Sequence, residues 1–252
     1  RTLQGKAILL QGEPERVTED IHMEDHFSDS EKAQLYAVYG KSYLRQNKLA
    51  LAEEKYKAAL AMEPQTVEAV VGLGSLSLMR HSLAEAEQQL KRAQENEPDN
   101  KDVLALQLEL AFAQKNYVTA ERMSQVLVKA HPYIPAYRVA LGQAQLLTGK
   151  LNEASANFDN LIKTFPNYPL AQYFRALVAY YEKDYRTAQI HADKALALYE
   201  HHLPSLFISG AANYSLGQFE MANRLLSRFV ATVPTNDKAQ KLLAATQIEL
   251  GM

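Results

Sequence analysis

The sequence has no cysteine and no tryptophan among its 252 residues. Without cysteine, the chain has no disulfide, thiol nucleophile, iron–sulfur cluster or cysteine-bound zinc. It also has little net charge, because 27 basic side chains nearly balance 29 acidic ones. A balance of that kind offers no broad basic face for nucleic acid. The lack of cysteine does not indicate a compartment, since a chain without thiols suits cytosol and periplasm equally.

Long apolar runs are missing as well. The longest uncharged stretch, from Leu203 to Phe219, includes a proline and an asparagine and is too short and too polar for a membrane span. The first residues, Arg-Thr-Leu-Gln-Gly, do not have the layout of a signal peptide. Near-average contents of apolar and charged residues predict a folded chain. We expect it to be part of a longer protein, with any membrane attachment outside this part.

Most of the chain is a sequence repeat with a period of 34 residues, which is the distance from Pro64 to Pro98. A row of prolines contains Pro64, Pro98, Pro132, Pro166 and Pro234, with Glu200 in the remaining place. A row of alanines contains Ala52, Ala86, Ala120, Ala154, Ala188 and Ala222. A row that is small at six of seven places contains Gly40, Gly74, Leu108, Gly142, Ala176, Gly210 and Ala244. A row of large apolar residues contains Leu49, Leu83, Tyr117, Leu151, Tyr185 and Phe219. Four rows in one register predict a repeat architecture.

Each row has a mechanical reason. Small residues let two helices approach closely, and a large residue before the second helix fills the space between the pair. Proline ends each unit because it cannot extend a helix. Turn-forming pairs such as Asn47-Lys48, Gly149-Lys150 and Gly217-Gln218 separate the two helices of a unit. The pattern therefore predicts units of two helices each.

This pattern resembles the tetratricopeptide repeat family. The first full unit carries it on Tyr36, Tyr39, Gly40, Tyr43, Ala52, Tyr56, Ala59 and Pro64. The resemblance implies an all-α fold, a right-handed superhelical solenoid of antiparallel helix pairs whose concave groove is lined by the first helix of each pair. The expected organisation is a degenerate leading repeat over 1–32, six units over 33–66, 67–100, 101–134, 135–168, 169–202 and 203–236, and a capping helix over 237–252. We expect the stretch from His22 to Ser30 to be a loop, with Asp29 or Ser30 as the N-cap of the next helix.

In the family's geometry, the second, fifth, ninth and twelfth places of each first helix face the groove. The early part of the groove is then polar and mildly acidic, and the later part is aromatic and apolar. The candidate partner-binding residues are Lys41, Glu68, Asp102, Glu109, Tyr173, Leu177, Tyr180, Phe207 and Tyr214. Aromatic anchors in a concave surface contribute ~1–2 kcal/mol or more each when a partner buries them. The alternative is that these tyrosines only pack between helices.

Family members that grip the C-terminal carboxylates of chaperones use lysine, asparagine and arginine at fixed groove positions. Here the corresponding positions hold Ala37 and Lys41, then Gly72, then Asp102 and Leu106. An acidic side chain in place of a cation repels a carboxylate. The sequence therefore argues against chaperone-tail binding.

No catalytic, cofactor or metal site is visible in the sequence. The seven histidines are His22, His26, His81, His131, His191, His201 and His202. None forms a zinc-binding helix motif, and His22 and His26 fall in the expected loop, where two solvated side chains are the simpler interpretation. The Gly72-Leu-Gly74 run lies in an expected helix without a preceding strand, so it does not form a dinucleotide-binding turn. We expect no cofactor and no enzymatic activity in this chain.

Three runs resemble a narrower bacterial group, the tetratricopeptide lipoproteins of the PEP-CTERM/exosortase protein-sorting system. The runs are 167–180, 202–212 and 241–251. The resemblance implies a non-catalytic scaffold that binds a partner peptide or helix in an exopolysaccharide-associated export or sorting system. It also implies a location in the cell envelope, facing the periplasm, with a lipid anchor upstream. Two alternatives stay open: a carbohydrate-interacting module of an exopolysaccharide machine, and a regulatory domain of a longer enzyme. A cytoplasmic location is also compatible with the composition.

Overall fold

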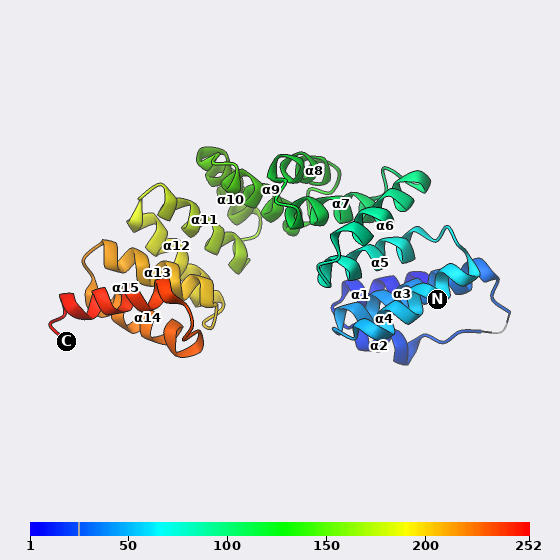
Figure 1. Cartoon of the computed structure of the whole chain (residues 1–252), viewed down its shortest axis with the longest axis horizontal. Coiled ribbons are helices and arrows are strands. Elements are labelled where there is room, and N and C mark those ends of the chain that lie inside the picture. The colour runs from blue at the N-terminus through cyan, green and yellow to red at the C-terminus, as the bar shows by residue number, and fades with distance from the viewer. Residues whose placement is uncertain (25) are drawn as a thin grey trace. The chain divides into compact units, whose positions relative to one another are not determined.

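The computed structural model describes residues 1–24 and 26–252 (Figure 1). In this part of the chain all regular structure is helical, and fifteen helices follow one another. They are α1 (Thr2–Leu10), α2 (Pro14–Asp20), α3 (Asp29–Arg45), α4 (Leu49–Met62), α5 (Val67–Met79), α6 (Leu83–Asn96), α7 (Lys101–Ala113), α8 (Tyr117–Ala130), α9 (Pro135–Leu147), α10 (Leu151–Thr164), α11 (Pro169–Tyr181), α12 (Tyr185–Leu198), α13 (Leu203–Ser215), α14 (Phe219–Thr232) and α15 (Asp237–Glu249). From α4 onward, the second helices begin at Leu49, Leu83, Tyr117, Leu151, Tyr185 and Phe219. The large apolar row therefore supplies the first residue of each second helix, rather than the residue before it.

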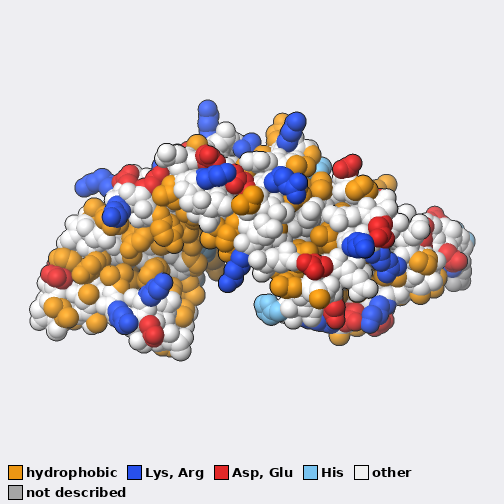
Figure 2. All heavy atoms as spheres, turned by 45° about the horizontal axis from the view of Figure 1, so that its top comes forward, with side chains coloured by type: hydrophobic (Ala, Val, Ile, Leu, Met, Phe, Trp, Pro, Cys, Tyr) orange, Lys and Arg blue, Asp and Glu red, His pale blue; other side chains and the backbone are white. Residues whose placement is uncertain are grey.

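The chain forms two compact units, Arg1–Met123 and Ser124–Met252, and the division falls within α8. In unit 1, α3 packs on α4 and α5 on α6, and the first helices α3, α5 and α7 also contact one another in succession. In unit 2, the same arrangement joins α9 to α10, α11 to α12 and α13 to α14, and α15 covers α14. Figure 2 shows hydrophobic side chains gathered on the visible face of unit 2, while charged side chains are mixed with them on that of unit 1. Each unit is thus a stack of helix pairs with its own core.

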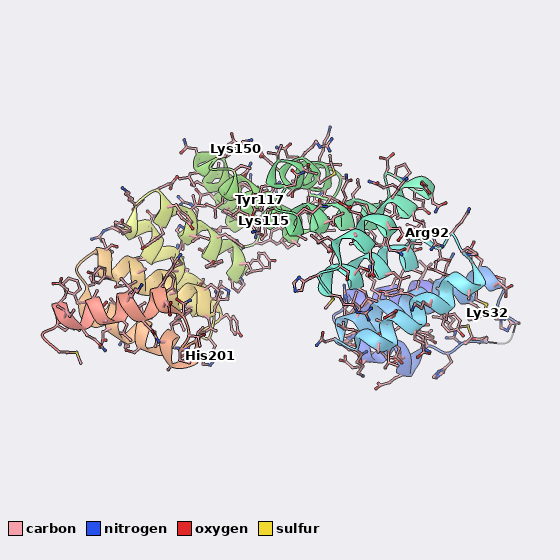
Figure 3. All side chains as sticks on the ribbon, in the orientation of Figure 1. Lys32, Arg92, Lys115, Tyr117, Lys150 and His201 are labelled. Atoms are coloured by element: carbon pink, nitrogen blue, oxygen red, sulfur yellow. The ribbon has the colours of Figure 1, made fainter. Side chains whose placement is uncertain are left out.

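One turn geometry ends the first helix of every pair. A positive φ follows the helix at the same place of each repeat, at Asn47, His81, Lys115, Gly149, Lys183 and Gly217. The next backbone N–H donates to a carbonyl of the last helical turn, as Lys48 N does to Tyr43 O at 2.9 Å. This pattern is the Schellman motif, which satisfies the free carbonyls at a helix C-terminus. Figure 3 labels Lys115, which turns the chain between α7 and α8.

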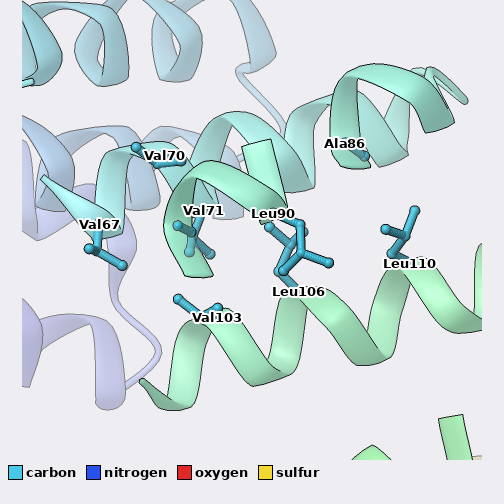
Figure 4. Close-up of a cluster of buried hydrophobic side chains, with 9 residues drawn as sticks. Val67, Val70, Val71, Ala86, Leu90, Val103, Leu106 and Leu110 are labelled. Atoms are coloured by element: carbon cyan, nitrogen blue, oxygen red, sulfur yellow. The ribbon is translucent and has the colours of Figure 1, made fainter. Parts of the chain in front are cut away.

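The core of unit 1 is a series of apolar clusters between successive pairs. In the cluster of Figure 4, α5, α6 and α7 interlock through buried aliphatic side chains, which include Val67, Val70, Val71, Ala86, Leu90, Val103, Leu106 and Leu110. Alanines at 86 and 93 are fully buried on the inner face of α6. Burial at ~25 cal/mol per Å² of apolar surface makes these contacts between neighbours the main source of stability.

The N-terminal helices α1 and α2 pack on α3, where the sequence predicts a degenerate leading repeat. The predicted N-cap of α3 at Asp29 or Ser30 is wrong, because both residues already lie in the helix. Ser28 is the cap: its hydroxyl accepts the Glu31 N–H at 3.3 Å, and the Glu31 carboxylate accepts the Ser28 N–H at 2.8 Å. This reciprocal capping box, with an extended backbone at Ser28, fixes where the helix begins. Of the loop predicted from His22 to Ser30, residues 22–24 and 26–28 are non-helical, and Asp25 lies outside the described residues.

Candidate functional site

Unit 1 contains a pocket of about 430 Å³ that is lined mainly by residues of its first helices. Four first helices contribute to it, α1, α3, α5 and α7, together with Tyr56 of the second helix α4. They do so because groove-facing places recur once in every repeat, so equivalent residues of neighbouring units come to lie side by side. The structure thereby brings together four residues singled out from the sequence: Lys41, Glu68, Asp102 and Glu109.

We refer to the apolar part of the lining formed by Ala37, Val71 and Ala105 as the floor of the pocket, although larger apolar residues such as Leu9, Leu44 and Leu106 line it as well. Ala37, Val71 and Ala105 occupy the same place in α3, α5 and α7, and all three line the pocket. Tyr56 reaches the floor from the second helix α4, where its ring is 2% exposed. The short side chains of the floor leave open space above them. The floor can therefore receive an apolar side chain from another molecule.

The rim of the pocket carries paired charges, two of which join alternate first helices, α1 to α5 and α3 to α7. Lys6 Nζ of α1 lies 3.0 Å from Glu68 Oε1 of α5. Lys41 Nζ of α3 lies 3.5 Å from Asp102 Oδ2 of α7, and Lys101 Nζ lies 3.9 Å from Asp102 Oδ1. These side chains are partly exposed, so each pair adds little to stability. Their effect on the pocket is that the three lysines are already engaged with carboxylates.

The charge of the pocket differs from the sequence-based prediction of a mildly acidic early groove. Four basic side chains line it (Lys6, Lys41, Arg45 and Lys101), against three acidic ones (Glu68, Asp102 and Glu109). The sequence-based prediction does not include three of the cations, because it considers only the second, fifth, ninth and twelfth places of the first helices from residue 33 onward. A lysine from the degenerate leading helix and side chains flanking the groove positions also reach the pocket.

Glu109 has a different environment from the other two carboxylates. It lies on α7 at the ninth place, and Ser75 Oγ of α5 donates to its Oε2 at 3.4 Å. Glu109 is exposed to solvent and is one of the residues that line the pocket. Neighbouring groups that take water away from its carboxylate raise the pKa of the Glu109 carboxyl, and Asp102 raises it further, while Ser75 and Lys41 act in the opposite direction. Among the described residues, Glu109 has no ion pair.

The five remaining candidate residues lie in unit 2. Tyr173, Leu177, Tyr180 and Phe207 are half-buried around a small cluster formed by the buried Ala176, Ala192 and Ile208. Burial raises the pKa of the Tyr173 and Tyr180 hydroxyls. The structure therefore brings these four together on α11 and α13, and Tyr214 follows on α13.

Each aromatic ring in this set already has a ring partner. Tyr180 makes an edge contact with Tyr185 at 5.5 Å between centroids, and Tyr214 makes the same contact with Phe219 at 5.7 Å. In both pairs the twelfth residue of a first helix meets the first residue of the second helix. Tyr173 lies 5.1 Å from His202, and Phe207 lies 5.5 Å from Phe229. Packing between helices therefore accounts for part of this aromatic content.

Sequence reasoning did not find a buried polar cluster in unit 2. His191 Nδ1 of α12 lies 2.7 Å from Gln172 Oε1 of α11. Nearby, Arg175 Nε donates to Asp159 Oδ1 at 2.8 Å, with the guanidinium side chain only 13% exposed. Burial, together with the positive charges of Arg175 and Lys194, lowers the pKa of His191 to about 4, and the negative charge of Asp159 opposes this shift. Only the packing of α12 on α11 makes this histidine different from the others.

Acidification is expected to destabilise unit 2 through His191. The unfolded chain binds a proton below the ordinary pKa of 6.5, whereas the folded chain does so only near a pKa of about 4. Stability is therefore complete above pH 6.5 and falls by about 1–2 kcal/mol between pH 6.5 and 4, allowing for partial screening. Urea unfolding at a series of pH values measures this change. The variant His191→Gln should lose this component of the pH dependence, and an identical profile in both proteins would contradict the assignment.

The other histidines have separate surroundings. His202 occupies the N-cap position of α13 and is half-buried, with its Nδ1 2.7 Å from Ser205 Oγ. His201 lies exposed on the turn before it. His26 Nε2 lies 3.6 Å from Glu24 Oε2. Across residues 1–24 and 26–252, no group of three side chains from His, Cys, Asp and Glu is placed to hold a metal ion. No helix in the same residues is long and apolar enough to cross a membrane.

Comparison with known proteins identifies the architecture. A family model described as tetratricopeptide repeat matches residues 40–101 and 139–202. The solved Cut9–Hcn1 hetero-tetramer of APC/C is similar over 98% of this chain and 48% of its own, with a TM-score of 0.83 and 16% identity. Pseudomonas aeruginosa PilF is similar over 86% of this chain and 99% of its own, with a TM-score of 0.74 and 19% identity.

A third similar structure is YrrB, described as a TPR protein with an unusual peptide-binding site. It is similar over 69% of this chain and 90% of its own, with a TM-score of 0.55 and 21% identity. Comparison with curated protein sequences finds no match. At these identities the solved structures show the fold, and they confirm the predicted all-α solenoid of helix pairs.

Proposed function

Because the chain belongs to the tetratricopeptide repeat family, whose members generally mediate protein–protein interactions, we propose that it is a non-catalytic scaffold. In this proposal, an extended peptide segment of a partner protein binds in the unit 1 pocket. The observation that carries the proposal is the composition of that pocket: an apolar floor of Ala37, Val71 and Ala105 beneath a rim of charged side chains. Apolar burial supplies affinity, and polar groups around it fix the orientation of the ligand.

The size and position of the pocket favour an extended peptide. It draws on four consecutive groove helices, so a ligand lying across them meets equivalent positions at regular intervals. YrrB, which has the same fold, is described as having a peptide-binding site. We propose that the chain over 33–236 is divided into six repeat units of equal length, and that their first helices line this groove.

A pocket-filling substitution tests the proposal. Random linear peptides displayed on phage are selected on the full chain, and binding of the selected peptides is measured by titration calorimetry. Ala105→Phe should weaken binding at least ~10-fold, because the new ring occupies the floor of the pocket. The matched control is Ala84→Phe, which adds the same ring at a more peripheral position of α6. Circular dichroism verifies helicity, and equal binding by both variants would exclude the pocket as the peptide site.

The aromatic residues of unit 2 are our second proposed contact surface. Tyr173, Leu177, Tyr180, Phe207 and Tyr214 are half-buried, so each keeps some accessible surface for a partner. The same surface is the basis of the carbohydrate alternative, since aromatic rings stack on sugars. Ring contacts within the unit reduce the area left for either kind of ligand. Titration with exopolysaccharide oligomers, followed by tyrosine NMR shifts, separates the two ligand classes.

We further propose a setting in the bacterial cell envelope, facing the periplasm, in an exopolysaccharide-associated export or sorting system. Support comes from the resemblance of the runs 167–180, 202–212 and 241–251 to the PEP-CTERM-associated lipoproteins. A lipid-attachment sequence upstream, with further repeats, would support this setting. A catalytic domain in the same longer chain would instead favour the alternative of a regulatory module of an enzyme.

A further inference from the structure

We propose that Glu109 is the recognition group for a lysine or arginine side chain of the bound peptide. This inference rests on the proposed function of the unit 1 pocket and names the kind of peptide that the pocket accepts. The geometry points to Glu109 because it is the carboxylate of the pocket whose charge is not already matched by a cation. The charges of the pocket, its apolar floor and the raised pKa of Glu109 all bear on this role.

The cations of the pocket are engaged within unit 1. Lys6 is paired with Glu68 at 3.0 Å, and Lys41 and Lys101 are both directed at Asp102, at 3.5 and 3.9 Å. The Arg45 guanidinium donates to the carbonyl of Leu9. Glu109 instead accepts one hydrogen bond from the neutral Ser75 hydroxyl, at 3.4 Å. An incoming cation therefore finds a carboxylate with open acceptor positions.

An anionic ligand is less well matched to the same pocket. To reach the lysines it would have to displace Glu68 or Asp102 from their ion pairs, and it would approach Glu109 at the same time. Like charges that are brought together in a partly desolvated site repel each other. A cationic ligand meets neither difficulty at Glu109. The arrangement of charges therefore favours a positively charged ligand, although basic side chains outnumber acidic ones in the lining of the pocket.

The floor suits the stem of a long basic side chain. Lysine and arginine carry an apolar chain of methylene groups that ends in a charged head. Val71 and Ala105 lie in the same pocket as Glu109, and Ala105 is one helical turn before it on α7. A stem lying on this floor is removed from water while its head reaches the carboxylate. The pocket thus offers both parts of a basic side chain a matching surface.

The proton equilibrium of Glu109 agrees with this role. Its surroundings raise the pKa of the carboxyl, so the charged form is less stable than in water. A bound cation restores that stability. Binding of a basic peptide should therefore strengthen as the pH rises through the raised pKa of Glu109. The other ionisable groups lining the pocket are Lys6 of α1, Lys41 and Arg45 of α3, Tyr56 of α4, Glu68 of α5, and Lys101 and Asp102 of α7.

A peptide selection compared between variants tests the inference. Random linear peptides on phage are selected on the native chain, on Glu109→Gln and on Glu95→Gln, which removes an exposed carboxylate of α6. Native chain and Glu95→Gln should both enrich a lysine or arginine at one peptide position, and Glu109→Gln should not. For a selected peptide, replacing that residue by glutamine should weaken binding about 10-fold on the native chain and little on Glu109→Gln.

A second variant, Glu109→Lys, reverses the charge and should shift the selected residue to aspartate or glutamate. The outcomes separate the two proposals. Peptides that bind without a basic preference, or with the same preference on Glu109→Gln, overturn the inference and leave the proposed peptide site intact. Binding that survives Ala105→Phe unchanged overturns the proposed site itself, and the role of Glu109 with it. A basic preference that disappears with Glu109→Gln and reverses with Glu109→Lys supports both.

Discussion

Replacing Tyr56 by alanine is expected to lower the free energy of unfolding of unit 1 by about 3–5 kcal/mol, as for other large aromatic residues in cores. The ring is among the largest fully buried side chains and lies at the centre of a cluster with Ala37, Ala52 and Leu76. It also fills the space between Gly40 of α3 and Gly72 of α5. Its removal leaves a cavity that two glycines cannot close. Urea unfolding followed by circular dichroism measures the loss.

The conservative variant Tyr56→Phe is the control. It keeps the ring and removes only the hydroxyl, so its stability should stay within about 1.5 kcal/mol of the native chain. If Tyr56→Ala were as stable as Tyr56→Phe, the ring would not be the element that joins α3 to α5. The same two variants also test the role of the Tyr56 ring in the pocket, because Tyr56 forms part of its lining.

Replacing Gly72 by alanine is expected to destabilise unit 1 by about 1–3 kcal/mol, the usual range for overpacking a core. A Cβ at this position would overlap the Tyr56 ring at three carbon atoms. The ring has no free direction, because Gly40 faces it on the other side and a Cβ there would lie 2.5 Å from Tyr56 Cε1. This loss exceeds the gain of about 1 kcal/mol that alanine brings to a helix interior over glycine.

Gly74→Ala is the matched comparison, because it adds the same methyl group to the same helix, close to Gly72. There the added Cβ would meet the end of the Leu106 side chain at 2.6 Å. A flexible leucine can move by a rotamer change, so Gly74→Ala should be less destabilising than Gly72→Ala. The double variant Gly72→Ala with Tyr56→Leu should recover part of the lost stability. Equal losses at both glycines, without recovery in the double variant, would contradict this account; chemical denaturation measures all of these proteins.

Both predictions depend on how residues from different rows of the repeat together fill the interior between neighbouring helices. At the position of Tyr56, the later second helices carry Leu90, Ser124, Phe158, Ala192 and Leu226. Phe158 packs against Gly142 and stacks on Phe174 at 5.4 Å. Ala192, the smallest of them, lies in a cluster with Ala176 and the larger Ile208. A small residue in one row is thus offset by a larger one in another, so that the interior stays filled.

The repeat period predicted most of the helices, because its rows record local requirements that recur in every unit. The turns are the plainest case: Asn47, Gly149 and Gly217 were recognised as helix breakers, and all three have the positive φ of a Schellman motif. The N-cap of α3 was misplaced, because Ser28, Asp29 and Ser30 are all good capping residues. Only the reciprocal bonds between Ser28 and Glu31 distinguish the first from the other two.

The sequence by itself determined the repeat, because the repeat depends on helix periodicity and on close approach at small residues, whereas the places expected to face the groove follow from the resemblance to the family. It did not determine the charge of the pocket. Lys6 and Glu68 are 62 residues apart, and their contact at 3.0 Å exists only once α1 lies beside the first helices that follow it. Only the tertiary structure therefore decided which carboxylates are matched by lysines, and left Glu109 with a neutral hydroxyl as its hydrogen-bond donor. Which charged side chains form ion pairs depends on their distances in space, and a sequence pattern does not contain those distances.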